Sequence, residues 1–259
     1  MNTDDEQWLT GFTEGDGTVG LYGTNDTKNL YVRVTWGQKE RDVLDYIAHL
    51  LNYGNVRIKK GTGYQLAYSG TFCMLLLEIF EKHVVSKTFC TRLNDILKFR
   101  ELKLATVHES SIDWLVGFWD AEGSSGNSRT LFIAQKGRQV LDVIANTFGG
   151  RVQSLQNYDM HQWYLCGDDA RKLARRILVR SHKPSKVERL RRNFEGPTHY
   201  ELHKNEIQAK NKTHYESHHA ERLACAHEHN KKKWQEHKLV SGYIRNHPEL
   251  LSKYEALSR

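Results

Sequence analysis

The sequence predicts an α+β protein made of two related domains, because one nine-residue pattern occurs twice and each copy is followed by the same local patterns. The pattern runs from Leu9 to Gly17 (LTGFTEGDG) and again from Leu115 to Gly123 (LVGFWDAEG). A Gln-Lys pair follows each copy, and an amphipathic helical pattern follows each pair. Alternating apolar and polar residues between these segments indicate strands.

Each motif is expected to form a helix, over Asp5–Phe12 in the first copy and Ser111–Phe118 in the second. Two small residues lie four positions apart in each copy, Gly11 and Gly15 in the first, Gly117 and Ala121 in the second. Residues four apart share one face of a helix. If these bare faces meet, the helices approach more closely than the usual separation of about 8–10 Å, which brings their C-terminal ends together.

A carboxylate stands at each helix end, Asp16 in the first copy and Glu122 in the second. The glycine after each acid can adopt the left-handed conformation that commonly ends a helix. Two carboxylates at the negative ends of two helices repel each other. A divalent cation with hard oxygen ligands, Mg²⁺ above all, relieves this repulsion and leaves coordination positions for water and phosphate. Gly15 and Ala121, which precede the acids, are further candidate metal ligands.

The strands are expected in the same order in both copies. In the first copy Thr18–Tyr22 and Leu30–Trp36 form a hairpin, and Asn55–Lys60 and Tyr64–Ser69 form another around Gly61-Thr62-Gly63. Leu30, Val32 and Val34 alternate with polar residues, and Val56 and Ile58 are expected to point inward. The corresponding strands of the second copy are Arg129–Gln135, Gly150–Gln156 and Gln162–Gly167.

The polar faces of these strands carry candidate nucleic-acid contacts. Arg and Gln side chains can pair with guanine or adenine edges in the major groove, although for any single residue a solvated strand face is the alternative. The candidates are Tyr31, Arg33, Thr35, Asn55, Arg57, Lys59 and Gln65 in the first copy, and Arg129, Arg151, Gln153, Gln162 and Tyr164 in the second.

With these two motifs, residues 5 to 195 resemble the LAGLIDADG homing endonuclease family in its single-chain, two-repeat form. The resemblance implies one αββαββα unit per repeat, motif helices at the domain interface, and saddle-shaped antiparallel sheets that lie in the DNA major groove. It divides the chain into domains at 1–106 and 107–195, with a basic helical C-terminal extension at 196–259.

The resemblance also assigns roles in catalysis. Asp16 and Glu122 match the metal-binding acids, and Gln38 and Gln135 match a position that orders water beside the site. A basic residue near the last helix completes the site: Lys87 fits in the first repeat, and either Lys183 or Lys186 fits in the second, because Pro184 interrupts the alignment. The cofactor implied is Mg²⁺ or Mn²⁺, with Ca²⁺ able to occupy the site without turnover.

The repeats differ in the length of their first hairpins. The acid and the glutamine are 22 positions apart in the first repeat and 13 in the second. The hairpin of the second repeat is therefore shorter by nine residues, and we expect an asymmetric target that is read less strictly in its second half.

Composition and charge agree with an intracellular DNA-binding protein. The formal net charge is +7, which favours nucleic acid weakly by itself and more when it lies on strand faces. No segment has the roughly 18 consecutive apolar residues of a membrane span, and the polar N-terminus does not resemble a signal peptide. We expect a monomer in the cytoplasm, nucleoid or an organelle, not secreted and not membrane-bound. The four cysteines form no CxxC pair.

The segment after Pro197 is rich in His, Lys and Glu and has helix-like stretches near 201–209, 216–225 and 248–257. The pairs His199/His203 and His214/His218 have a spacing that can bind zinc, but no nearby acid or cysteine set accompanies them, so solvated histidines are the alternative. The run Lys231-Lys232-Lys233 suggests a phosphate-contacting patch.

The function expected is cleavage of a long double-stranded DNA target by metal-dependent phosphodiester hydrolysis. The alternatives are an intron maturase, for which intron RNA is the partner, and a DNA-binding regulator that does not cut. Loss of either acid would favour the alternatives, whereas both acids and both glutamines are present.

Overall fold

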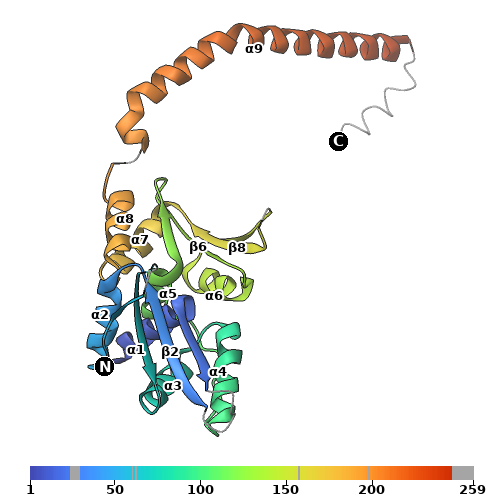
Figure 1. The fold of residues 1–259 in the computed structure, drawn as a ribbon. Coiled ribbons are helices and arrows are strands. Elements are labelled where there is room, and N and C mark those ends of the chain that lie inside the picture. The colour runs from blue at the N-terminus through green and yellow to red at the C-terminus, as the bar shows by residue number, and fades with distance from the viewer. Residues whose placement is uncertain (24–29, 60, 62, 157, 198, 247–259) are drawn as a thin grey trace. The chain divides into compact units, whose positions relative to one another are not determined.

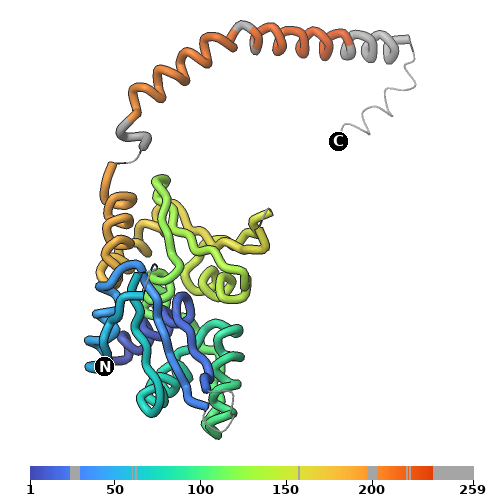
Figure 2. The backbone as a smooth tube through the Cα atoms, viewed as in Figure 1, coloured from blue at the N-terminus to red at the C-terminus, as the bar shows by residue number. Residues whose placement is uncertain are grey.

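The structure is a computed structural model that describes residues 1–259 except 24–29, 60, 62, 157, 198 and 247–259 (Figure 1, Figure 2). The chain divides into two compact units, Met1–His199 and Tyr200–Arg259. Both repeats lie in the first unit, and the expected strand Asn55–Lys60 and turn Gly61-Thr62-Gly63 fall partly outside the described residues.

The first repeat consists of α1 (Thr3–Asp16), β1 (Gly17–Tyr22), β2 (Tyr31–Gln38), α2 (Arg41–Leu50), β3 (Arg57–Lys59), β4 (Gly63–Ser69), α3 (Phe72–His83) and α4 (Lys87–Phe99). The second repeat consists of α5 (Ile112–Glu122), β5 (Gly123–Gly126), β6 (Thr130–Gln135), α6 (Arg138–Phe148), β7 (Arg151–Leu155), β8 (Met160–Leu165), α7 (Gly167–Leu178) and α8 (Pro184–Phe194). The two repeats have the same order of elements, which confirms the α+β class and the duplication.

Each described repeat ends with one helix more than the αββαββα unit implies. In the first repeat Val84 is extended and ends α3, and the Ser86 hydroxyl then caps α4 by accepting the Phe89 N–H at 3.3 Å. In the second repeat Pro184 occupies the first turn of α8, where its missing N–H costs nothing. The last helical region of each repeat is therefore two helices joined by a short extended segment.

The strands form two four-stranded antiparallel sheets, ordered β1-β2-β4-β3 and β5-β6-β8-β7. Alternation along β2 buries Val32 and Val34 and leaves Tyr31 exposed, as predicted, and it also buries Trp36. Leu30, the third residue predicted on the apolar face, lies just before the strand. The first hairpin is shorter in the second repeat, with strands of four and six residues in place of six and eight.

The expectation that Ile58 points inward is wrong, because its side chain is 82% exposed. β3 spans only Arg57–Lys59 and is an edge strand that pairs with β4. All three of its residues are exposed. A strand this short at the edge of a sheet does not extend far enough over the core to bury an alternate side chain.

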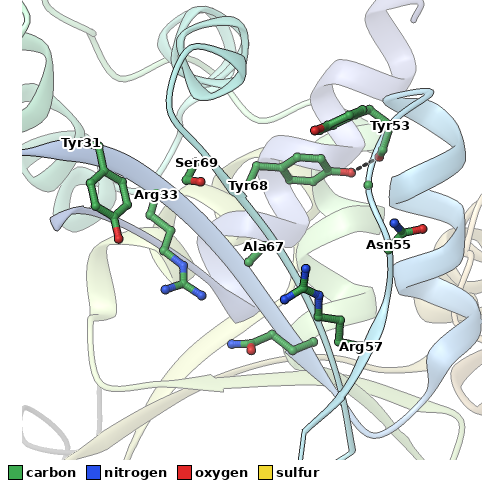
Figure 3. A pocket seen from close by; sticks show the side chains of 10 residues that line it. Tyr31, Arg33, Tyr53, Asn55, Arg57, Ala67, Tyr68 and Ser69 are labelled. Atoms are coloured by element: carbon green, nitrogen blue, oxygen red, sulfur yellow. Dashed lines mark hydrogen bonds between the residues drawn. The ribbon is translucent and has the colours of Figure 1, made fainter. Parts of the chain in front are cut away.

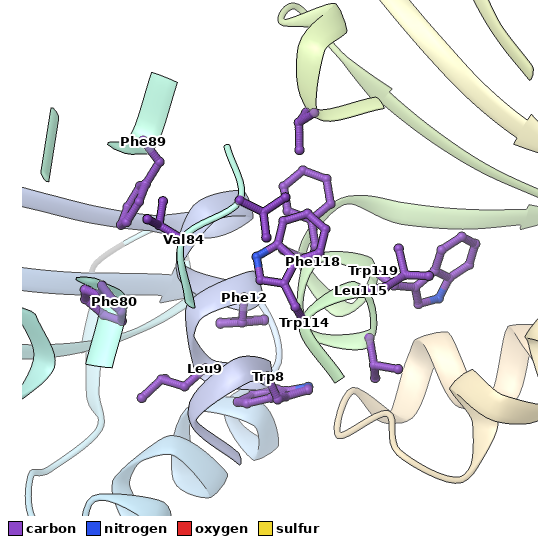
Figure 4. Packing of buried hydrophobic residues seen from close by; sticks show 14 of the residues in the cluster. Trp8, Leu9, Phe12, Phe80, Val84, Phe89, Trp114, Leu115, Phe118 and Trp119 are labelled. Carbon is purple, nitrogen blue, oxygen red and sulfur yellow. The ribbon is translucent and has the colours of Figure 1, made fainter. Parts of the chain in front are cut away.

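The motif helices α1 and α5 pack face to face at the centre of the first unit, and both end four residues beyond the predicted ranges. A methyl group added at Gly11 would overlap the Trp114 carbonyl oxygen, and one added at Gly117 would overlap the Trp8 carbonyl oxygen. The contacts are thus reciprocal and need glycine at both positions. Trp8 stacks on Phe12 with ring centroids 5.2 Å apart, and Trp114 stacks on Phe118 at 5.0 Å (Figure 4).

The second unit contains most of helix α9 (His199–Asn246), which has a kink at His203. The expected helices near 201–209 and 216–225 lie inside α9, and the one near 248–257 lies outside the described residues. The His214 and His218 rings are 4.3 Å apart, but the described part of the chain contains no group of three or more potential metal-binding side chains. Lys231, Lys232 and Lys233 are exposed.

The described residues contain four free cysteines: Cys73 and Cys90 are buried, and Cys166 and Cys225 are exposed. Across residues 1–246, outside the gaps given above, no helix has the length and apolar character needed to cross a membrane.

Candidate active site and nucleic-acid interface

The two acids lie at the ends of the paired helices, where Asp16 is the last residue of α1 and Glu122 is the last residue of α5. The following glycines are extended, with φ −90° at Gly17 and −68° at Gly123, so the left-handed cap expected from the sequence is wrong. Glycine is needed there for space: an added methyl would overlap Thr13 at the first position and the Trp119 ring at the second.

Each acid is held by the glutamine of its own repeat. The Gln38 Nε2 group donates to Asp16 Oδ2 at 2.6 Å, and Gln135 donates a side-chain hydrogen bond to Glu122. Burial raises the pKa of Glu122, and the nearby negative charge of Asp16 raises it further, while Gln135, Lys186 and Lys183 oppose this. The two carboxylates are therefore close enough for each to affect the ionisation of the other.

Both candidate lysines of the second repeat reach this site. Lys183 is the N-cap residue of α8, and its Nζ donates to Gln38 Oε1 at 2.9 Å. Lys186, one turn later, donates to the carbonyl oxygens of Ala121, at 3.4 Å, and Gly123. Burial, followed by the positive charge of Lys183, lowers the pKa of Lys186 to about 8. The site therefore contains a glutamine that bridges an acid of one repeat to a lysine of the other.

Lys87 has a different environment from these two lysines. It is the exposed first residue of α4, and its backbone N–H donates to Gln139 Oε1 at 3.0 Å. The N-cap position of α4, which corresponds to Lys183, is occupied by Ser86.

The donor set fits a hard divalent cation. Two carboxylates converge, and within the described residues no third His, Cys, Asp or Glu joins them to make a closed metal cluster. Mg²⁺ is characteristically bound by one or two carboxylates and completes its shell with water and substrate phosphates. The mutual repulsion that raises the pKa of Glu122 is the electrostatic condition that such a cation relieves.

Two further carboxylates, Glu14 and Asp120, support the site and were missed in the sequence. Glu14 accepts the backbone N–H groups of Val85 and Ser86, at 2.8 and 2.6 Å, and the Trp114 indole N–H at 3.0 Å. Glu14 therefore ties the start of α4 to the motif helix of the other repeat.

Asp120 makes the matching contacts in the second repeat. It accepts the Ser181 hydroxyl at 2.5 Å, the His182 N–H at 2.9 Å and the Trp8 indole N–H at 3.1 Å. Burial raises the pKa of Glu14 to about 7 and that of Asp120 to about 6, against the lowering effect of these hydrogen bonds. The sequence signal was an acid at the same place in both motifs, each preceded by a tryptophan.

A groove on the polar face of the first sheet brings together five predicted DNA contacts (Figure 3). It has a volume of about 420 Å³. The predicted residues that line it are Tyr31, Arg33, Asn55, Arg57 and Gln65, and Tyr53 and Ser69 line it as well without having been predicted. The Arg33 guanidinium lies 5.8 Å from the centre of the Tyr22 ring. Thr35 lies on the same strand as Arg33, and Lys59 is exposed on β3.

The second sheet presents a smaller polar face. Arg151 pairs with Tyr164, and Gln153 pairs with Gln162, to which it donates a hydrogen bond at 3.2 Å. Arg129 lies elsewhere, in the turn before β6 with φ +56°, and its guanidinium donates to the Gly196 carbonyl oxygen at 3.2 Å. Four of the five predicted contacts of this repeat thus lie on one sheet face.

Comparisons with known proteins found a matching family model and solved structures of similar fold. Residues 9–102 match the family model of the LAGLIDADG endonucleases. The I-SmaMI homing endonuclease bound to cleaved DNA is similar in fold, with a TM-score of 0.55 and 12% identity, over 73% of this chain and 86% of that chain. The I-AabMI meganuclease bound to uncleaved DNA has 18% identity and a TM-score of 0.48, over 76% of this chain and 99% of that chain.

Proposed function

We propose that the chain is a LAGLIDADG endonuclease, the family whose model matches residues 9–102, and that it makes a double-strand break at one long, asymmetric duplex sequence. The observation that carries the proposal is the convergence of Asp16 and Glu122 at the ends of two helices that contact each other through glycine. Paired acids of this kind are what phosphodiester hydrolysis with a divalent cation requires.

Asp16 and Glu122 would hold the cation, and Mg²⁺ suits them because it needs few protein ligands. When bound, the cation supplies Lewis-acid polarisation of the scissile phosphates and lowers the pKa of the attacking water. Gln38 orients the Asp16 carboxylate through its amide N–H and orders the Lys183 ammonium through its amide oxygen. Gln135 has the matching role at Glu122.

Lys183 and Lys186 stabilise the negative charge that accumulates on the phosphoryl oxygens in the transition state. Positive groups that are already ordered act strongly in such a site, because they need no reorganisation during the reaction. The reduced pKa of Lys186, about 8, leaves most of its amines protonated at neutral pH.

Target recognition is assigned to the polar sheet faces. The groove that contains Arg33 and Arg57 supplies guanidinium groups suited to guanine edges, and Gln153 and Gln162 supply amides suited to adenine. The shorter hairpin of the second repeat supports weaker sequence specificity in the half of the DNA target that this repeat contacts. Because one chain contains both halves of the site, we propose that the protein acts as a monomer, and that it acts on DNA inside the cell or an organelle.

The test is cleavage of a randomised duplex library with Mg²⁺ by the intact protein, Asp16→Asn and Glu122→Gln. The matched control is Asp142→Asn, since this acid is 45% exposed and pairs with Arg138 on the surface of α6. We expect discrete cuts by the intact protein and the control, and binding without cuts by the two active-site variants. Specific binding of DNA or intron RNA with no cut by the intact protein would instead indicate a regulator or a maturase.

A further inference from the structure

The two halves of the site can be compared residue by residue through the helices that end each repeat. Ser86 is the N-cap of α4, and Lys183 is the N-cap of α8. The buried Leu93 and Leu190 each lie seven positions after their caps, which fixes the register. In this register Phe89 of the first repeat corresponds to Lys186 of the second.

The half beside Gln38 is filled by charged groups. Lys183 bonds to Gln38, and Lys186 bonds to the carbonyl oxygens that follow the α5 motif. Glu40 closes the outer side by accepting the Ser185 N–H at 3.1 Å and the Ser185 hydroxyl at 2.5 Å. Two ammonium groups are thus held next to the acids before any substrate binds.

The half beside Gln135 contains a cavity of about 290 Å³ in the corresponding position. Ser86 and Phe89 stand at the positions that Lys183 and Lys186 occupy in the other half. Gly137 likewise stands at the position of Glu40. The residues that define the cavity include Gly15, Gly17, Ser86, Phe89, Arg92 and Gln135. Lys136, next to Gln135, lines the cavity as well, but Lys39 follows Gln38 in the same way in the other half, so this lysine does not distinguish the two halves. Arg92, on the exposed side of α4, is the cation that this helix contributes to the cavity wall.

The reaction in each half is the same. The oxygen of a water molecule bonds to phosphorus, one phosphorus–oxygen ester bond breaks, the water loses a proton to solvent, and the leaving sugar oxygen gains one from solvent. The negative charge on the phosphoryl oxygens rises at the transition state in both halves. Among the described residues at the ends of α4 and α8, Lys183 and Lys186 supply ammonium groups held by hydrogen bonds in the half beside Gln38, whereas Ser86 and Phe89 supply none in the other half. Removing one preorganised donor from an active site typically slows a reaction by about 10²–10³-fold.

Resting on the nuclease function proposed above, we propose that the two halves cut their strands at unequal rates, with the Lys183 and Lys186 half the faster, and that Arg92 supplies the cation of the slower half. A duplex nicked in one strand then accumulates before the double-strand break. Because Arg92 replaces part of the missing charge, we expect a ratio of about tenfold or more between the strands.

The experiment follows the two strands separately. A supercoiled plasmid that carries the target shows nicked and linear products, and a duplex labelled on each strand gives the two rate constants with Mg²⁺. We expect nicked plasmid to accumulate. Arg92→Ala should lower the rate of cleavage of the slower strand alone, by about tenfold or more. Lys183→Ser should slow the faster strand.

The reciprocal variant Ser86→Lys places at the α4 cap the residue that the α8 cap already has, and should speed the slower strand. Arg92→Ala changes an exposed side chain, so its result does not depend on whether the fold tolerates the lysine introduced by Ser86→Lys. Equal rates on both strands in the intact protein, without nicked plasmid, would overturn the inference alone. Absence of cleavage on both strands would overturn the proposed nuclease function and this inference with it.

Discussion

Gly117→Ala is the most direct perturbation of the interface that brings the two acids together. Its new methyl group would overlap the Trp8 carbonyl oxygen and lie 2.8 Å from the Phe12 backbone nitrogen. Both atoms belong to the backbone of α1, so the clash is relieved only if α1 and α5 separate. Overpacking of this kind costs about 1–3 kcal/mol.

Separation of the helices also weakens the hydrogen bond from Trp8 to Asp120, which is 3.1 Å long and buried. A hydrogen bond to a charged group is worth about 1.5–3 kcal/mol. Alanine returns about 1 kcal/mol through its higher helix propensity. If the hydrogen bond is lost entirely, the net loss in the free energy of unfolding is about 1.5–5 kcal/mol, which lowers Tm by roughly 3–20 °C in a unit of this size.

The assay is thermal and urea unfolding of the full chain, with Gly37→Ala as the matched control. Gly37 has a negative φ and no atom within 4 Å of an added methyl, so its replacement should leave the free energy of unfolding within about 1 kcal/mol of the original value. Cleavage by Gly117→Ala should fall as well, because the acids move apart. A Gly117→Ala protein as stable as the control would refute the close contact between the helices.

Three further predictions concern pH, recognition and the second unit. Burial raises the pKa of Glu14 in the folded state from about 4.5 to about 7. The stability linked to this group is therefore fully present below pH 4.5, and about 3 kcal/mol of it is lost as the pH rises through 7. Urea unfolding across this pH range should show a smaller loss of stability in Glu14→Gln. Arg57→Ala should weaken target binding by about 1–3 kcal/mol and relax the sequence required at one position, measured on a panel of single-base target variants; uniform weakening across the panel would indicate a phosphate contact. Deletion of residues 200–259, which contain Lys231–Lys233, should lower DNA affinity and the slope of its salt dependence; an unchanged slope would remove the phosphate-patch hypothesis.

The duplication made most of the fold predictable. Glycine at the matching positions Gly11 and Gly117 predicted a close helix contact, and the structure has that contact. The alternation along β2 was also reliable, because one side of that strand covers the core. Ile58 was misjudged because alternation alone does not tell where an edge strand passes beyond the core.

The surroundings of the acids were less predictable. Pairing Gln38 with Lys183 requires contact between residues 145 positions apart in the sequence, from different repeats. The local pattern around Pro184 could not decide between Lys183 and Lys186, and the structure brings both to the site because α8 begins at Pro184. Glu14 and Asp120 were missed because their partners lie far away in the sequence, 61–112 positions from Asp120 and 71–100 positions from Glu14, so that the repeated acid alone did not reveal its contacts.

The reciprocal contacts of Trp8 with Gly117 and of Trp114 with Gly11 give the interface the geometry of a two-fold symmetric dimer. Two identical subunits on such an axis would have to change together and would read palindromic DNA. Segment 100–111 joins the repeats covalently, and a tether of this kind holds them together at an effective concentration in the millimolar range. Each repeat is then free to diverge, as Phe89 has from Lys186, and the target sequence no longer has to be its own inverted repeat.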